Sequence, residues 1–192
     1  MTKPYRTSPR LKDYDYARNG AYFITICTQN RACLFGSVRE GEMYLNPAGE
    51  MLGEWWRKLP EKFSTVETDA LVIMPNHVHG ILVLFEEPDT GAHVGAPLQE
   101  VDQPEEHIPS ESAVPTAASL STIIQWFKSM TTNGYMHGVK EQGWPRFAGK
   151  LWQRSYYDHI IRDEVDLKYI QRYILSNPAR WEQDSENRHM RS

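Results

Sequence analysis

Two short apolar runs, separated only by Pro75-Asn76, constrain the fold of this chain more than any other feature of its sequence. The runs TDALVIMP (68–75) and HVHGILVLF (77–85) are rich in β-branched residues, and each has the length of one strand. Strands joined by so short a turn pair in antiparallel fashion. The sequence therefore predicts an antiparallel hairpin over 68–85.

The second run of this hairpin contains two histidines, His77 and His79. Side chains alternate faces along a strand, so residues at i and i+2 project from the same side. Two neutral imidazoles on one face could converge on a divalent cation, with a third ligand from elsewhere in the fold. A purely structural role for the pair stays open at this point.

The remaining elements are predicted from hydrophobic periodicity. Strands are expected at 21–30 and 150–162, and helices at 46–63, 119–134 and 163–177. The order is β-α-β-β-α-β followed by a final helix. This is the ferredoxin-like, split βαβ pattern of the α+β class, with an antiparallel sheet and helices on one face.

The expected helix ends rest on capping residues. Asn46 before Pro47, Ser119 or Ser121, and Asp163 are the expected N-caps. The pair Asn133-Gly134 is expected to end the second helix, and Pro178 to end the third at Asn177.

An acidic, proline-rich segment interrupts the pattern between the hairpin and the second helix. Residues 86–119 hold eight acidic residues and five prolines but no Lys or Arg. Such a composition packs poorly, so we expect residues 1–192 to form one domain with a disordered insertion at 86–119. Removing this −8 segment from the total charge of −4 leaves +4 for the rest of the chain.

The basic residues outside the insertion are candidates for contacts with phosphates, although a solvated surface explains each of them equally well. Those selected as DNA-binding candidates are Arg6, Arg10, Lys12, Arg18, Lys128, Arg154 and Arg162.

The final helix places Tyr173 and Asn177 one turn apart on the same face. An amide oxygen suits a hard cation such as Mg²⁺ or Mn²⁺, and a phenol becomes a nucleophile when a metal or a base activates it. Tyr173 as a core aromatic residue is the alternative.

Three blocks of the sequence together carry a family resemblance. MPNHVHGILV (74–83) resembles the His-hydrophobic-His signature of HUH endonucleases, and YYDHIIR with YILSNP resembles the C-terminal block of the REP-associated tyrosine transposases. The resemblance runs from about Tyr22 to Trp181, interrupted by the acidic insertion.

The resemblance implies roles for individual residues. Tyr173 is implied as the nucleophile, and His77 and His79 as ligands of a divalent metal, Mg²⁺ or Mn²⁺. Asn177 falls where related enzymes place a polar third ligand, often Gln. Asp158 and His159 belong to the family block without an assigned chemical role.

The implied activity is cleavage and rejoining of single-stranded or hairpin DNA through a 5′-phosphotyrosine, in a monomer or homodimer. A DNA-binding module without turnover and a metal-dependent hydrolase that activates water are the alternatives. No apolar run approaches the roughly 18 residues of a membrane span, and the N-terminus lacks a secretory signal, so a cytoplasmic protein is expected.

Overall fold

The computed structural model of the chain describes residues 19–86 and 118–187. The basic residues Arg6, Arg10, Lys12 and Arg18 and nearly all of the predicted insertion at 86–119 lie outside these ranges. The elements in chain order are β1 (Gly20–Cys27), η1 (Gln29–Arg31), β2 (Gly36–Arg39), β3 (Glu42–Leu45), α1 (Pro47–Arg57), α2 (Leu59–Lys62), β4 (Val66–Met74), β5 (His77–Leu84), α3 (Leu120–Glu141), β6 (Tyr157–Ile161), α4 (Glu164–Ser176) and η2 (Pro178–Gln183).

The central sheet has the strand order β4-β5-β1-β6, with every neighbouring pair antiparallel. Strands β1 and β4 are joined through α1 and are separated in the sheet by β5, which is the split βαβ arrangement. The predicted ferredoxin-like α+β fold is confirmed. The predicted hairpin is also confirmed, since β4 and β5 are connected only by Pro75 and Asn76.

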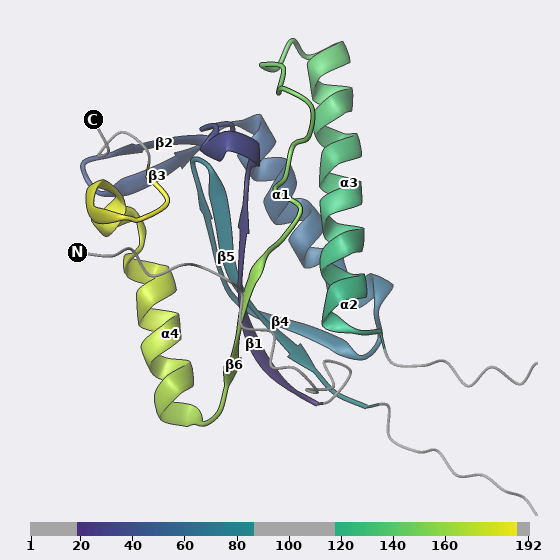
Figure 1. The fold of residues 1–192 in the computed structure, drawn as a ribbon, viewed down its shortest axis with the longest axis vertical. Coiled ribbons are helices and arrows are strands. Elements are labelled where there is room, and N and C mark those ends of the chain that lie inside the picture. The colour runs from purple at the N-terminus through teal and green to yellow at the C-terminus, as the bar shows by residue number, and fades with distance from the viewer. Residues whose placement is uncertain (1–18, 87–117, 188–192) are drawn as a thin grey trace, which may run out of the picture.

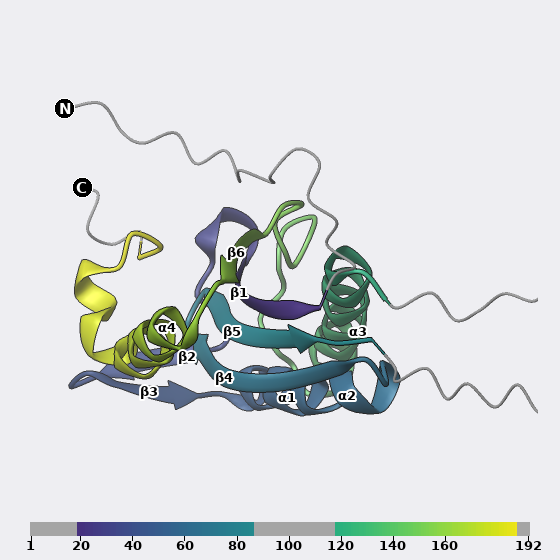
Figure 2. The same ribbon diagram turned by 90° about the horizontal axis from the view of Figure 1, so that it is seen from below.

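Both faces of the sheet are covered. Helices α1 and α3 lie on one side and α4 on the other (Figures 1 and 2). Tyr22, Ile24 and Ile26 of β1 enter the larger core beneath α1 and α3, whereas Phe23 enters a smaller core with Ile174 of α4. This alternation is the period of two that a strand buried on both faces requires. The helix that carries Tyr173 thus lies on the side of the sheet opposite α1 and α3.

The predicted N-caps are confirmed at all three helices. The side chain of Asn46 accepts a hydrogen bond from Gly49 N, Ser119 from Thr122 N, and Asp163 from Asp166 N. Each cap satisfies one of the backbone donors that the first turn of a helix leaves without an intrahelical partner.

The predicted end of the second helix at Asn133-Gly134 is wrong, because α3 continues to Glu141. A Cβ atom at position 134 would lie 3.0 Å from Met51 Sδ and 3.3 Å from Trp55 Nε1. The glycine lets α3 approach α1 closely, and tertiary packing therefore overrides its usual role as a helix stop.

Two other expectations need correction, those for 150–162 and 46–63, and one hairpin was not predicted. The strand predicted at 150–162 is restricted to β6, and Trp152 forms only an isolated bridge with Thr28. The short hairpin β2–β3 was not predicted; it lies beside η2 at one end of the molecule (Figure 1). The helix predicted at 46–63 is divided into α1 and α2 at Lys58.

Among the described residues, no helix combines the length and the apolar character that crossing a membrane requires.

Two glycines on the α1 side of the sheet should respond in opposite ways to alanine. A Cβ at Gly80 in β5 would lie 2.5 Å from the Trp56 ring, whereas a Cβ at Gly53 in α1 would meet only Ile73 at 3.7 Å. We expect Gly80→Ala to lower the free energy of unfolding by about 1–3 kcal/mol through overpacking. We expect Gly53→Ala to raise it by up to about 1 kcal/mol through helix propensity. Urea unfolding of both variants measures this, and an unchanged midpoint for Gly80→Ala would contradict the packing.

Candidate active site

The two histidines lie side by side on the α4 face of the sheet, as predicted. His77 is fully buried and His79 is 3% exposed, and their ring centroids are 4.5 Å apart. Val78 between them belongs to the opposite core. Buried polar groups need partners, so the contacts of each imidazole indicate what it can do.

The orientation of His77 is set by its neighbour in the hairpin turn, Asn76. The amide nitrogen of Asn76 donates to Glu186 O at 2.8 Å and to Arg31 O at 3.3 Å, which directs its oxygen toward His77 Nδ1 at 2.8 Å. An amide oxygen only accepts, so Nδ1 of His77 carries the proton. In the neutral ring Nε2 then has the lone pair that a metal requires.

His79 is held from its other side by Thr25 on the neighbouring strand β1. The Thr25 hydroxyl lies 2.8 Å from His79 Nδ1, and Phe23 packs against the imidazole with its ring centroid at 5.2 Å. A threonine hydroxyl can accept a hydrogen bond from Nδ1–H, and His79 then has the same tautomer as His77. Both histidines can therefore present Nε2 as a ligand.

Tyr173 reaches the histidines from α4. Its hydroxyl lies 3.4 Å from His79 Nε2, and its half-buried ring packs edge-on against Phe23. Ile170 and Ile174 are buried on the same helix and hold it against the sheet. In contrast, Tyr169 is 71% exposed, so only Tyr173 of these two tyrosines meets the histidines.

The structure adds an acidic group to the two histidines, and this group was not predicted. Asp184 follows η2, and one of its carboxylate oxygens lies 3.7 Å from His77 Nε2, while the other accepts a hydrogen bond from Glu186 N at 2.7 Å. The ligand atoms of His77, His79 and Asp184 all lie within 4.8 Å of one another. No sequence spacing connects Asp184 with the histidines, because the fold of the C-terminal segment brings them together.

The C-terminal segment that carries Asp184 is fixed by Glu186, which is 3% exposed. The Glu186 carboxylate forms an ion pair with Arg31 and accepts from Cys27 Sγ at 3.4 Å. Its backbone oxygen accepts from Asn76, the residue that orients His77. One residue therefore ties the position of Asp184 to the position of the first histidine.

Asn177, the predicted third ligand, caps the C-terminus of α4 and is 2% exposed. Its side-chain oxygen has no hydrogen-bond partner among the described residues. A buried amide oxygen without a donor is costly, and a cation is one group that would satisfy it. Its role as a ligand stays a prediction.

These residues fit a divalent cation. His77 Nε2 and the Asp184 oxygen both present lone pairs, and their separation of 3.7 Å is longer than a hydrogen bond. Two atoms bound to one ion at 2.0–2.1 Å are at most about 4.2 Å apart, so the pair lies at a distance that one ion could bridge. Two imidazoles with one carboxylate suit a transition-metal ion such as Mn²⁺.

The other predicted residues lie away from this group or have structural contacts. The ammonium of Lys128 donates to the backbone oxygens of Gln153, Arg154 and Ser155 at 3.0–3.4 Å, and burial lowers the pKa of Lys128 to about 8. The side chains of Arg154 and Arg162 are exposed.

His159 and Asp158 now have distinct surroundings. His159 Nε2 lies 3.0 Å from an Asp166 carboxylate oxygen, so this histidine has a hydrogen-bond partner within the fold, away from the ligand group. Asp158 is buried and is the neighbour of His159 in β6, so the two project from opposite faces of the sheet.

The chain is similar to known proteins over most of its length. No protein-family model matches the chain. An uncharacterised protein of Haemophilus influenzae is 37% identical over 183 residues, covering 94% of this chain and 92% of that protein. A second protein of the same organism, named "Putative REP-associated tyrosine transposase", is 26% identical over 166 residues, covering 86% of this chain and 74% of that protein.

Among solved structures, a REP-associated tyrosine transposase bound to a REP hairpin has a TM-score of 0.54 and 20% identity, covering 89% of this chain and 74% of that one. Over most of its length this chain is similar to REP-associated tyrosine transposases. The resemblance carried by the histidine and tyrosine blocks is thereby confirmed at the level of the family. At 20% identity the structural likeness itself speaks only for a shared fold.

The contact between Asn76 and His77 leads to a prediction about metal affinity. Asn76→Ala removes the acceptor that keeps the proton on His77 Nδ1, and loss of such an outer partner lowers metal affinity by about 10- to 100-fold. Titration calorimetry with Mn²⁺ measures the change. Asn46→Ala is the matched control, because it removes a cap on the far side of the sheet and should leave Mn²⁺ affinity unaltered. Equal Mn²⁺ affinity for the two variants would contradict the proposed tautomer.

Proposed function

We propose that this chain cleaves and rejoins single-stranded DNA through a covalent bond between Tyr173 and a 5′-phosphate, with a divalent cation held by His77, His79 and Asp184. The observation that carries the proposal is the position of the Tyr173 hydroxyl, 3.4 Å from His79 Nε2 and beside the group of ligand atoms. Asn177 is a further candidate ligand from the same helix.

The tyrosine performs the bond exchange in this scheme. The phenol oxygen of Tyr173 attacks phosphorus, the bond from phosphorus to the 3′-oxygen breaks, and the departing 3′-oxygen receives a proton. A 3′-hydroxyl from another strand end can reverse the step, because the phosphotyrosine keeps the energy of the original bond. Rejoining therefore needs no nucleotide cofactor.

Activation of the phenol is the main chemical requirement, since its ordinary pKa is about 10. Because the single lone pair of His79 Nε2 would be used to hold the cation, the phenol proton would pass to solvent. The Tyr173 hydroxyl lies 3.4 Å from that nitrogen, so a cation held there would favour the phenolate form of the nucleophile. When bound, the cation would polarise a non-bridging phosphate oxygen and offset negative charge in the transition state.

Hairpin or repeat DNA is the proposed substrate class. The solved relative with the shared fold is described as bound to a REP hairpin, and the rest of this chain outside the acidic insertion has a net positive charge. An unpaired segment beside a hairpin gives the tyrosine access to a phosphate without opening a duplex.

The tyrosine variant tests the proposal most directly. Tyr173→Phe keeps the ring packed against Phe23, so we expect the fold and DNA affinity to persist while the covalent protein–DNA adduct disappears. A denaturing gel with labelled single-stranded DNA measures the adduct. Tyr169→Phe, one turn earlier on α4 and exposed, should leave the adduct intact.

The alternative functions predict different results on the denaturing gel. An adduct that persists in Tyr173→Phe would show that another residue is the nucleophile. Binding without an adduct in the unaltered chain would indicate a DNA-binding module, and cleavage without an adduct would indicate a hydrolase that activates water.

The carboxylate is tested by Asp184→Asn. This change keeps the size of the side chain and the hydrogen bond from Glu186 N but removes the charge, so Mn²⁺ affinity should fall by at least about tenfold and adduct formation with it. Asp163→Asn is the matched control, because asparagine caps a helix as well as aspartate does. If chelation by EDTA leaves adduct formation unaffected, the metal part of the proposal is wrong.

A further inference from the structure

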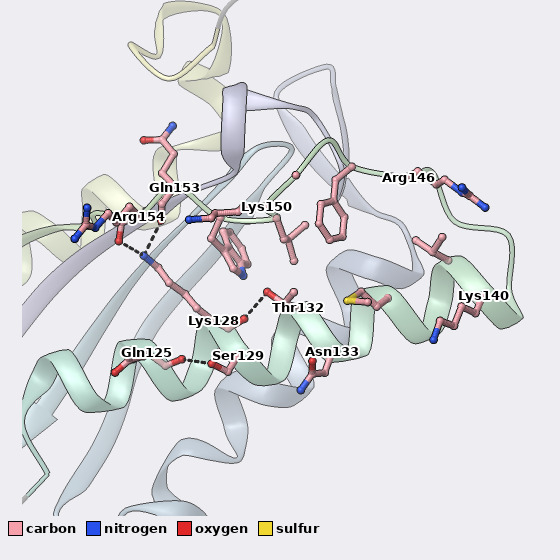
Figure 3. Close-up of a pocket in the computed structure, with 16 residues that line it drawn as sticks. Gln125, Lys128, Ser129, Thr132, Asn133, Lys140, Arg146, Lys150, Gln153 and Arg154 are labelled. Carbon is pink, nitrogen blue, oxygen red and sulfur yellow. Dashed lines mark hydrogen bonds between the residues drawn. The ribbon is translucent and has the colours of Figure 1, made fainter.

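A groove of about 850 Å³ lies between α3 and the segment that leads from it toward β6 (Figure 3). It is on the α3 side of the sheet, whereas Tyr173 lies on the α4 side. The groove therefore has no part in the bond exchange proposed above, and its chemistry needs a separate explanation.

The groove is basic. Five cationic residues line it and no Asp or Glu does so. The ammonium of Lys128 donates hydrogen bonds to three backbone oxygens, so it is less available to a ligand than the other cations. The four others, Lys140, Arg146, Lys150 and Arg154, have exposed side chains. Positive charge without a neighbouring carboxylate favours an anionic ligand.

The cations are distributed along the groove instead of converging on one point. Arg146, Lys150 and Arg154 recur every fourth residue in the segment after α3. In Figure 3, Arg146 lies at one end with Lys140, Arg154 lies at the other, and Lys150 lies between them. A single small anion could contact only part of this row, whereas a chain of phosphates could follow all of it.

The wall of the groove between the cations is largely apolar and includes an accessible aromatic ring. Phe147 is half-buried, and its ring is held edge-on against buried Tyr135 at 5.5 Å. Met136, which is 46% exposed, lines the same groove from α3. Trp152 closes the floor, with its indole N–H donating to Thr131 at 2.9 Å. A fixed ring beside a row of cations is the combination that binds unpaired bases and their phosphates.

We propose that this groove binds a segment of single-stranded DNA, with phosphates along Arg146, Lys150 and Arg154 and a base against Phe147. This proposal rests on the proposed function in one respect, namely that the ligand is DNA. Because the groove and Tyr173 are on different sides of the sheet, the bound segment is a different part of the substrate from the strand that is cut. The groove would hold the substrate while the tyrosine exchanges its ends.

The test uses the full chain carrying Tyr173→Phe, so that cleavage does not disturb the measurement. Fluorescence anisotropy compares a hairpin oligonucleotide bearing a single-stranded thymidine extension with the same hairpin lacking it. The groove variant is Arg146→Gln/Lys150→Gln/Arg154→Gln. The control variant, Arg57→Gln/Lys58→Gln/Lys62→Gln, removes the same charge from exposed positions that do not line the groove.

We expect the groove variant to bind the extended hairpin about tenfold more weakly than the control variant. For the groove variant, the slope of log affinity against log salt concentration should be shallower by roughly 2. The variant removes three cations, and each phosphate contact in a single strand contributes about 0.7 to this slope. Phe147→Leu should weaken binding of the extended hairpin by about fivefold without changing this slope, because stacking is lost and charge is kept. Thermal unfolding of each variant confirms that the fold is retained.

Three results would overturn the proposal: equal affinity of the groove and control variants, an equal loss for the hairpin without the extension, or tighter binding of the matching RNA. The adduct assay on the chain with Tyr173 intact separates this proposal from the proposed function. An adduct with no effect of the groove variant means that the groove assignment alone is wrong. Groove-dependent binding without any adduct means that the proposed function alone is wrong.

Discussion

The burial of both faces of strand β5 is the constraint on which the rest of the structure depends. Its pairing with β1 and β4 satisfies both of its edges, and the cores on the two sides of the sheet bury both of its faces. One face contributes Val78 and Leu82 to the core under α1 and α3. The other carries His77 and His79 and can be covered only by an element on the opposite side, which is α4. Two buried imidazoles would be unfavourable without partners, and the structure supplies them from the turn, from β1, from α4 and from the C-terminal segment.

The C-terminal segment is as important to the site as the strand that bears the histidines. Glu186 pairs with Arg31, accepts from Cys27 and receives the Asn76 amide, so it connects the segment to β1 and to the hairpin turn at once. The same segment delivers Asp184 to His77. The orientation of the first histidine and the position of the carboxylate are therefore coupled. A change in this segment should disturb the ligand group even though it lies far along the chain from the histidines.

The sheet also separates two kinds of surface. On the α4 side a buried, polar group of side chains is suited to chemistry at one phosphate, and on the α3 side an open basic groove is suited to holding a longer polyanion. In the proposed strand exchange, the groove would hold an uncut part of the substrate while the tyrosine exchanges the cut ends. The low pKa of Lys128, about 8, follows from its place beneath that groove, where burial disfavours the ammonium while three backbone oxygens accept its hydrogen bonds.

The sequence by itself determined the hairpin, the position of His77 and His79 on one face, and the caps Asn46 and Asp163, because these depend on periodicity and on hydrogen bonds between residues close in the chain. It narrowed the cap of the second helix to Ser119 or Ser121, of which the structure uses Ser119. Its spacing placed Tyr173 and Asn177 on one face of the last helix, and the family resemblance implied Tyr173 as the nucleophile. Only the tertiary structure decided that Gly134 lies within a continuous helix, because the close approach of Met51 and Trp55 comes from another part of the chain. The same holds for Asp184, whose meeting with His77 depends on how η2 and the residues after it return to the sheet. Contacts between distant segments follow from packing and from the burial of charge, which local patterns do not encode.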